Sequence, residues 1–210
     1  AEGMVYHRGM ASRGLDAFLG ESGGIAAVLR SMRVHLKNAN VQAMGCWSLV
    51  NLALNHQQKL ALLALDGLDA VLAAMAHHPT TLEVQFRALF ALINLVIPEA
   101  GSVSTNTMDC GENAAHARVV RGVLAAMRHF PESEKLVRCG CLVLHNLSLD
   151  DKNVPHLLAF GVARPLQRAA RSHKDADVQR SAVSTLRRLR VAVAPEVDVL
   201  QPTLRMDGSR

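Results

Sequence analysis

The side chains with the clearest capacity for chemistry are four cysteines and ten histidines. Thiolates and imidazoles bind zinc, and a histidine beside a cysteine or carboxylate serves in catalysis. The cysteines lack paired spacing with nearby histidines; they are Cys46, Cys110, Cys139 and Cys141. His77 and His78 fall in a predicted turn, and His145 precedes an asparagine inside a predicted helix. We therefore expect no metal or cofactor site, and interpret the histidines as turn and surface residues.

Other signatures of catalysis or membrane insertion are also missing from the sequence. It holds no glycine-rich phosphate loop, no nucleophile elbow and no carboxylates paired at usable spacing, so we expect no enzyme. No apolar run reaches about 18 residues, which predicts no membrane span. The first residues do not resemble a secretory signal. Cys46, Cys139 and Cys141 lie in predicted helices, where cysteine is usually buried. Free thiols favour a reducing compartment, the cytoplasm or the nucleus.

What organises the chain is an internal repeat. The segment Val41-Gln-Ala-Met-Gly-Cys-Trp-Ser-Leu-Val-Asn-Leu returns at Val84, Leu136 and Val178, at offsets of 43, 52 and 42 residues. A second segment has the same offsets and begins at Gly24, Gly67, Val119 and Gly161. Repeats of this length are typical of helical solenoids, in which each unit buries its apolar face by stacking on its neighbours. The pattern predicts a single elongated all-α domain over about residues 11–193.

Each repeat reads as three helices, and the four units run over about 11–54, 55–98, 107–149 and 150–193. In the second unit the helices are expected at 56–65, 67–77 and 81–97, with Gly67 between the first two and Thr80 or Thr81 capping the third. In the third unit, only 114–118 reads as a first helix. An insertion of about 99–113, rich in Ser, Thr and Asn, predicts a surface loop. Residues 194–210 read as a tail.

Superposing the units shows which positions should form the core. Leucine recurs at three places: Leu29, Leu72, Leu124 and Leu166 on the second helices, and Leu49, Leu92, Leu144, Leu186, Leu52, Leu95, Leu147 and Leu189 on the third. Each buried leucine contributes roughly 1.5–3 kcal/mol of transfer free energy. A fourth shared position is always small: Gly45, Ala88, Gly140 and Ala182. Small residues there should let helices approach closely, and a larger side chain should overpack the contact.

This pattern resembles the armadillo repeat, in which a short helix precedes two longer ones. The second helix begins Gly-Ile or Gly-Leu, and the third ends Trp-x-x-x-Asn-Leu. Phrases such as Val71-Leu-Ala-Ala-Met and Glu83-Val84-Gln85 look most like divergent armadillo repeats of protist proteins. HEAT repeats usually have two helices per unit, and the glycine break argues against them. The resemblance implies an α-α superhelix, a right-handed solenoid of about four three-helix repeats.

In armadillo proteins the third helices line a concave groove that holds extended peptides. Trp47 and Asn51 match the family's aromatic and amide positions, Phe90 and Asn94 keep both types, and Asn146 keeps the amide. An indole offers a rigid apolar plate, and a carboxamide suits a peptide backbone. The groove residues that the resemblance implies are Asn40, Met44, Trp47, Asn51, Arg87, Phe90, Asn94, Leu142, Asn146 and Arg188, with Glu83, Lys135, Cys139, Asp177, Ser181 and Ser184 as further lining. Alternatively, the asparagines have a structural role and form hydrogen bonds with the backbone of the adjacent turn, and Trp47 packs in the core.

Charge separates the candidate partners. The net charge of +5 arises entirely after residue 105 and concentrates in the last unit. This basic cluster is interpreted either as a solvated end cap or as a surface for an acidic peptide, nucleic acid or lipid. The preferred function is a scaffold that binds an extended or helical segment of another protein. The alternatives are an adaptor that reads basic peptides, as importin-alpha does, and a nucleic-acid binder using the basic last unit.

Overall fold

A computed structural model describes residues 23–97 and 110–193, and every regular element within these ranges is an α-helix. The all-α prediction is therefore confirmed for this part of the chain. In chain order the helices are α2 (Gly24–Val34), α3 (Ala39–Leu52), α4 (His56–Ala64), α5 (Gly67–His77), α6 (Leu82–Leu95), α7 (Cys110–His129), α8 (Glu134–Leu147), α9 (Asn153–Ala159), α10 (Ala163–Ser172) and α11 (Ala176–Arg188). The predicted first helix of the first unit, the predicted insertion as far as residue 109 and the predicted tail lie outside the described residues.

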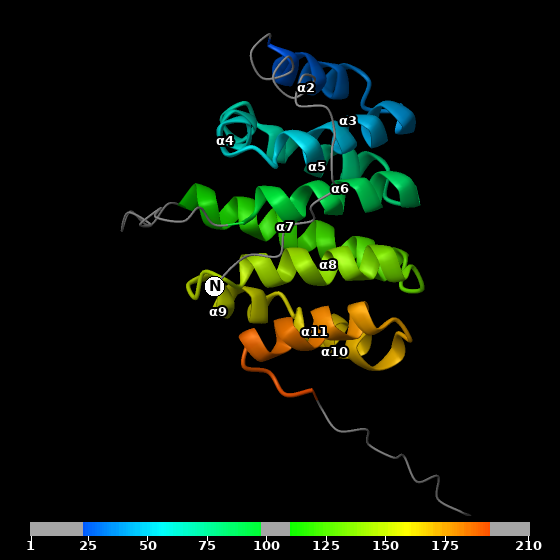
Figure 1. The fold of residues 1–210 in the computed structure, drawn as a ribbon, viewed down its shortest axis with the longest axis vertical. Coiled ribbons are helices and arrows are strands. Elements are labelled where there is room, and N and C mark those ends of the chain that lie inside the picture. Colours follow the sequence, from blue (N-terminus) through cyan, green and yellow to red (C-terminus); the bar gives the residue numbers. More distant parts are fainter. Residues whose placement is uncertain (1–22, 98–109, 194–210) are drawn as a thin grey trace, which may run out of the picture.

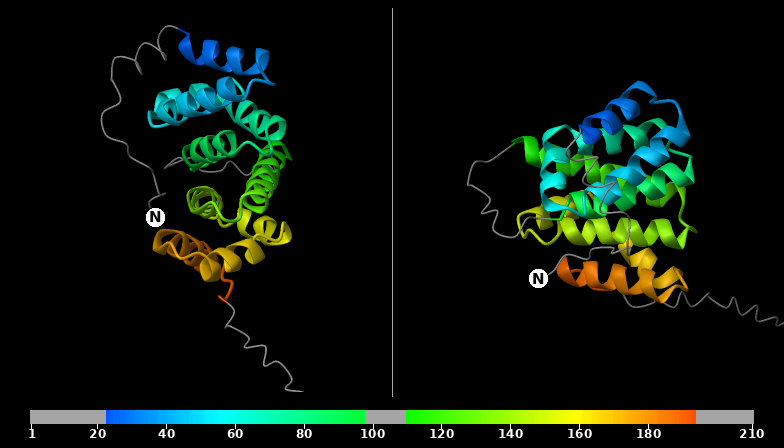
Figure 2. Two further views of the ribbon diagram at one scale, coloured as in Figure 1. Left: turned by 90° about the vertical axis from the view of Figure 1, so that its right-hand side faces the viewer. Right: turned by 45° about the horizontal axis from the view of Figure 1, so that its top comes forward.

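The helices follow one another along the long axis in chain order, from α2 at one end to α10 and α11 at the other (Figure 1). Two series of contacts run along this stack. The predicted third helices, α3, α6, α8 and α11, pack each on the next, and the predicted second helices α2, α5 and α7 do the same. Figure 2 (left) shows these series as two layers. We call them the third-helix layer and the second-helix layer; α10 continues the latter.

The leucine positions lie where the repeat predicts. Leu49, Leu92, Leu144 and Leu186 are all completely buried in the third-helix layer. Of the twelve aligned leucines, eleven are buried and only Leu124 is partly exposed. Because equivalent leucines meet along the stack, one continuous hydrophobic core joins all the units that the structure describes.

Helix ends are tied by polar side chains that recur at the repeat spacing. Gln42 donates from its amide nitrogen to the carbonyl oxygens of Met32 (2.8 Å) and His35 (2.9 Å) at the end of α2. Gln85 repeats both bonds at the end of α5, to Met75 and His78. Carbonyl groups at a helix end have no partner within the helix, so these glutamines satisfy them in the interior.

Side-chain caps at the helix starts follow the same logic but only partly match the sequence prediction. The Asn38 and Asp175 side chains accept two backbone N–H bonds each at the starts of α3 and α11, as good N-cap residues do. Thr81 occupies the N-cap position of α6 as predicted, but its side chain makes no capping hydrogen bond.

The third unit departs from the predicted three-helix pattern. A single helix, α7, runs from residue 110 to 129, where the sequence predicts a short helix at 114–118 followed by a break. In the second unit a Cβ atom on Gly67 would lie 2.7 Å from the Leu62 carbonyl oxygen, so the reversal between α4 and α5 excludes a side chain there. Val119 stands at the equivalent position and is completely buried. A valine has no place in that reversal, and the helix continues instead.

Within the described ranges no single helix is both long and apolar enough to cross a membrane. One bent pair, α4 with α5 at 68°, meets the length and composition requirement.

Candidate functional site

Three aromatic side chains form a row on the surface of the third-helix layer. The Trp47 ring on α3 stacks on the Phe90 ring of α6 with centroids 5.8 Å apart and planes 21° apart. Phe86, one turn before Phe90 and so on the same helix face, continues the row at 6.0 Å. All three are partly buried and pack against the core. We call Trp47, Phe86 and Phe90 the aromatic row.

Arg87 covers one end of the aromatic row. Its guanidinium carbon lies 5.5 Å from the centre of the Trp47 ring, a cation–π distance. The same guanidinium pairs with Glu83 one turn earlier on α6 and donates to the Met44 sulfur at 3.1 Å. The arrangement holds a planar cation over a planar indole and leaves Met44 56% exposed beside them. Together these side chains offer aromatic, thioether and cationic contacts within one surface.

The asparagines at the shared third-helix position do not all play one role. Asn146 on α8 donates to the Ile93 carbonyl oxygen at the end of α6, 2.9 Å away. Arg188, its counterpart on α11, donates to the carbonyls of Ser148 (2.9 Å) and Leu149 (2.8 Å) beyond the end of α8. Both therefore tie a third helix to the end of the one before it. Asn94 is only 3% exposed, yet neither atom of its amide has a hydrogen-bond partner.

The unsatisfied amide of Asn94 predicts an unusual mutational result. A buried polar group without a partner costs about 1–3 kcal/mol, so Asn94→Leu, which removes it at similar volume, should leave the free energy of unfolding unchanged or raise it. Asn146→Leu is the matched control, because it breaks the bond to Ile93 and should destabilise by about 1 kcal/mol. Urea unfolding of both variants measures the difference. Equal destabilisation would show that Asn94 is an ordinary structural residue.

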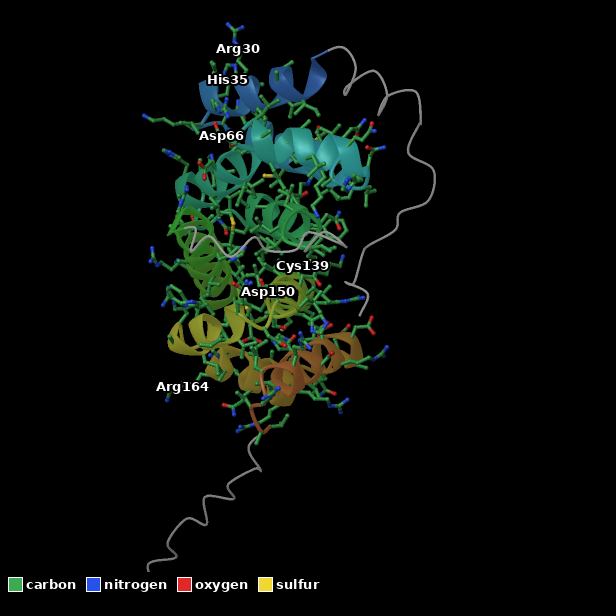
Figure 3. All side chains as sticks on the ribbon, turned by 90° about the vertical axis from the view of Figure 1, so that its left-hand side faces the viewer. Arg30, His35, Asp66, Cys139, Asp150 and Arg164 are labelled. Atoms are coloured by element: carbon green, nitrogen blue, oxygen red, sulfur yellow. The ribbon has the colours of Figure 1, made fainter. Side chains whose placement is uncertain are left out.

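The other residues that the sequence analysis placed in the groove divide by exposure. Asn40 is exposed and Asn51 is partly exposed at the two ends of α3, so both lie at the surface near Trp47. Leu142 is only 3% exposed and belongs to the core. Cys139 is also buried, and Figure 3 shows it inside the stack. The surface beside the aromatic row is therefore formed by α3 and α6, and α8 adds little to it.

Toward the C-terminal end, charges on the third-helix layer neutralise one another. Asp177 on α11 pairs with Arg138 of α8 at 3.0 Å and with Arg180 at 3.2 Å. Arg188 pairs with Asp151 at 3.0 Å in addition to its carbonyl bonds. Glu83 and Asp177, the two acids that the sequence places on this face, are thus both already paired with arginines.

The groups considered first for catalysis occupy inert environments. Burial raises the pKa of the thiols of Cys46, Cys139 and Cys141 to about 12, so they are protonated at neutral pH. His145 is partly buried, and this burial, followed by the nearby Arg188 charge, lowers its pKa below the ordinary 6.5. Across residues 23–97 and 110–193 no group of three His, Cys, Asp or Glu side chains is placed to hold a metal ion.

Two contributors to this region were not anticipated from the sequence. Phe86 belongs to the aromatic row, and its spacing of four residues from Phe90 is the signal that would have found it. Arg87 was expected to contact a ligand. Its stacking on Trp47 could not be predicted, because the two residues belong to adjacent units and the sequence does not show which residues of adjacent units are in contact.

No model of a protein family matches this chain, and a search of curated proteins finds no match either.

Proposed function

We propose that the chain is an armadillo-type right-handed solenoid that binds another protein without catalysis. An extended or helical segment of that protein lies across α3 and α6, on the third-helix layer. The observation that carries this proposal is the aromatic row beside the unsatisfied Asn94 amide. Partly buried aromatic rings on a rigid helix face are the side chains that most often anchor protein interfaces.

Each element of this surface has a counterpart in peptide recognition. The ring of Phe90 offers apolar area at little entropic cost, since it is already held by its neighbours. Asn94 lies one turn beyond it on α6, and neither the donor nor the acceptor of its buried amide is satisfied. A peptide group presents one acceptor and one donor, so rotation of the Asn94 side chain toward the surface on binding lets a bound backbone satisfy the amide whatever its side chains are.

The pairing of charges counts against an adaptor for basic peptides. Such an adaptor needs acidic groups that are free to receive lysine or arginine, whereas Glu83 and Asp177 are held by arginines of the chain itself. The buried thiols agree with the proposed location in the cytoplasm or nucleus, where cysteines remain reduced.

The proposal is tested by selecting peptides from a random display library against the intact chain and measuring their affinity for variants. Trp47→Ala and Phe90→Ala should each weaken binding by more than about 1 kcal/mol, because they remove aromatic anchors. Asn94→Leu should also weaken binding while the protein stays as stable as before. Phe130→Ala, a partly buried aromatic at the end of α7, is the control and should leave affinity unchanged.

The outcome that would reject this function is a lower thermal unfolding midpoint for the Trp47 and Phe90 variants with undiminished affinity, which would make both rings core residues. Selection of mainly lysine-rich peptides would favour the basic-peptide adaptor instead. Binding of single-stranded oligonucleotides with a steep salt dependence would favour the nucleic-acid alternative.

A further inference from the structure

A groove opens on the second-helix layer, away from the aromatic row, where α7 and α10 lie side by side. Its volume is about 610 Å³. The floor is apolar and includes Leu124, Met127 and Ala169, and prolines at 131 and 165 stand at its rim. Its charged lining consists of Arg128 from α7 and Arg164 and Arg168 from α10, and the His173 imidazole also lines it. No carboxylate lines it among the described residues.

The same groove occurs one unit earlier, between α5 and α7, with a volume of about 400 Å³. Leu72, Met75 and Pro79 line it at the positions that Leu124, Met127 and Pro131 occupy in the second copy. Where the second copy has arginines, the first has small residues: Ala76, Gly122 and Ala126 in place of Arg128, Arg164 and Arg168. The first copy therefore lacks these three arginines, and its own basic residues, Arg118, Arg121 and His129, stand at other positions.

The arginines of the second copy are not used by the fold. Arg128, Arg164 and Arg168 are exposed, and within the part of the chain that the structure describes none of them forms an ion pair. Figure 3 shows Arg164 at the edge of the stack, pointing outward. The first copy differs here too, because its Arg118 is paired with Asp69 at 2.6 Å. The positive charge of the second groove is thus uncompensated.

Local folding does not explain these arginines. Arg164, Arg168 and Arg171 are spaced four and three residues apart, so they share one face of α10. Like charges at this spacing destabilise a helix, and alanine at the same positions would form a better one. Small residues at this position in the preceding unit also allow α5 and α7 to pack directly. Neither helix preference nor an ion pair accounts for Arg164 and Arg168, which points to a role in binding.

We propose that the groove between α7 and α10 binds an acidic segment of a partner protein. The guanidinium groups bind carboxylates of the segment in a planar, bidentate geometry. Apolar side chains of the segment pack on Leu124 and Met127. This site is separate from the surface on α3 and α6, and it does not depend on the function proposed for that surface.

The lining favours a peptide over a nucleic acid. Single-stranded nucleic acids bind through aromatic platforms on which bases stack. Among the described residues, the aromatic rings in the lining are Phe160 and the imidazole of His173, and the Arg121 guanidinium already lies over Phe160 at 5.5 Å. The floor is otherwise aliphatic, which suits leucine or valine side chains between acidic ones better than it suits a row of stacked bases.

The test uses a fluorescent peptide of glutamates with interspersed leucines and a counterpart with glutamine in place of every glutamate. The full chain should bind the glutamate peptide about tenfold more tightly than the glutamine peptide, with affinity falling as salt is added. The variant Arg164→Ala/Arg168→Ala places small residues where the first copy has Gly122 and Ala126, and it should lose about tenfold in affinity. Its thermal unfolding midpoint should not fall, because both side chains are exposed.

Five further measurements test the site and distinguish its possible occupants. Arg30→Ala/Arg187→Ala removes the same charge from exposed sites elsewhere, so an equal loss in this variant would overturn the proposal. The proposal would also be overturned if oligothymidylate bound more tightly than the acidic peptide and this binding were lost in the Arg164→Ala/Arg168→Ala variant. A rise of about tenfold in peptide affinity on deleting residues 194–210 would identify this segment, which contains Glu196 and Asp198, as the occupant and would overturn the proposal. Dimerisation that is lost in the arginine variant would identify a second copy as the occupant and would also overturn it. Trp47→Ala/Phe90→Ala should leave binding of the acidic peptide intact; its loss there would place the peptide on the other layer and reject the site.

Discussion

Replacing Leu144 by alanine should lower the free energy of unfolding by about 2–5 kcal/mol, a large loss for a single substitution. Leu144 is completely buried in α8, whose neighbours in the third-helix layer are α6 on one side and α11 on the other. Truncation leaves a cavity where three units meet. Since each unit of a repeat stack is stabilised mainly by its interfaces, damage at a central unit weakens both adjoining interfaces.

Chemical denaturation followed by circular dichroism measures this loss. Leu158→Ala on α9 is the matched control, because that leucine is 39% exposed and its truncation should change stability by no more than about 0.5 kcal/mol. A single cooperative transition that shifts as a whole would show that the described units unfold together. A loss below about 1 kcal/mol for Leu144→Ala would mean that the leucine positions do not form the interior of the stack.

The helices and their core were predictable from the sequence because the repeat superposes equivalent positions. Helix α5 spans residues 67–77 as expected, and α4 and α6 differ from their predicted ranges by one or two residues at the ends. The information lies in periodicity: a leucine that returns at 43, 52 and 42 residues marks a buried position more reliably than its own local sequence does. The register, once found, supplies the layers and most of the core.

The departures arise where one residue replaces the type that the repeat favours. Val119 in place of glycine turns two expected helices into the continuous α7. Arg188 in place of asparagine still ties its helix to the preceding one, through a longer side chain. Some substitutions therefore keep the structural role of a position, as at Arg188, and others change the local structure, as at Val119. Aligning the repeats by residue type does not distinguish these two cases.

The candidate site was less predictable than the fold because it depends on partners across units. Asn94 and Asn146 have the same residue type at equivalent positions, yet one bonds a carbonyl and the other is unsatisfied. The difference is set by where α6 and α8 lie relative to the helix before each of them. Likewise, the basic cluster of the last unit is visible in composition, but only the folded chain shows that Arg128 of α7 joins Arg164 and Arg168 of α10 in one groove.

Replacing Gly140 by valine should cost about 1–3 kcal/mol, because the Met127 side chain of α7 already fills the space that the new side chain needs. A Cβ atom on Gly140 would lie 2.7 Å from the sulfur and 2.8 Å from the Cγ of Met127, which is itself almost fully buried. Valine is a better helix former than glycine by a few tenths of a kcal/mol, so the overlap must outweigh that gain. Gly122→Val provides the comparison, since its nearest neighbouring atoms are 3.6 Å away and the helix preference should dominate.

The decisive measurement is a double-mutant cycle with Met127→Ala. The fourth unit has alanine at both equivalent positions, Ala169 and Ala182, and both are buried without a long side chain between them. Met127→Ala alone should cost about 2–5 kcal/mol by leaving a cavity, and valine at 140 should fill part of it. The double variant is therefore expected to lose less stability than the sum of the single losses, by about 0.5–3 kcal/mol. Strict additivity would mean that the two side chains do not compete for the same space, and that the small residue shared by all units has another cause.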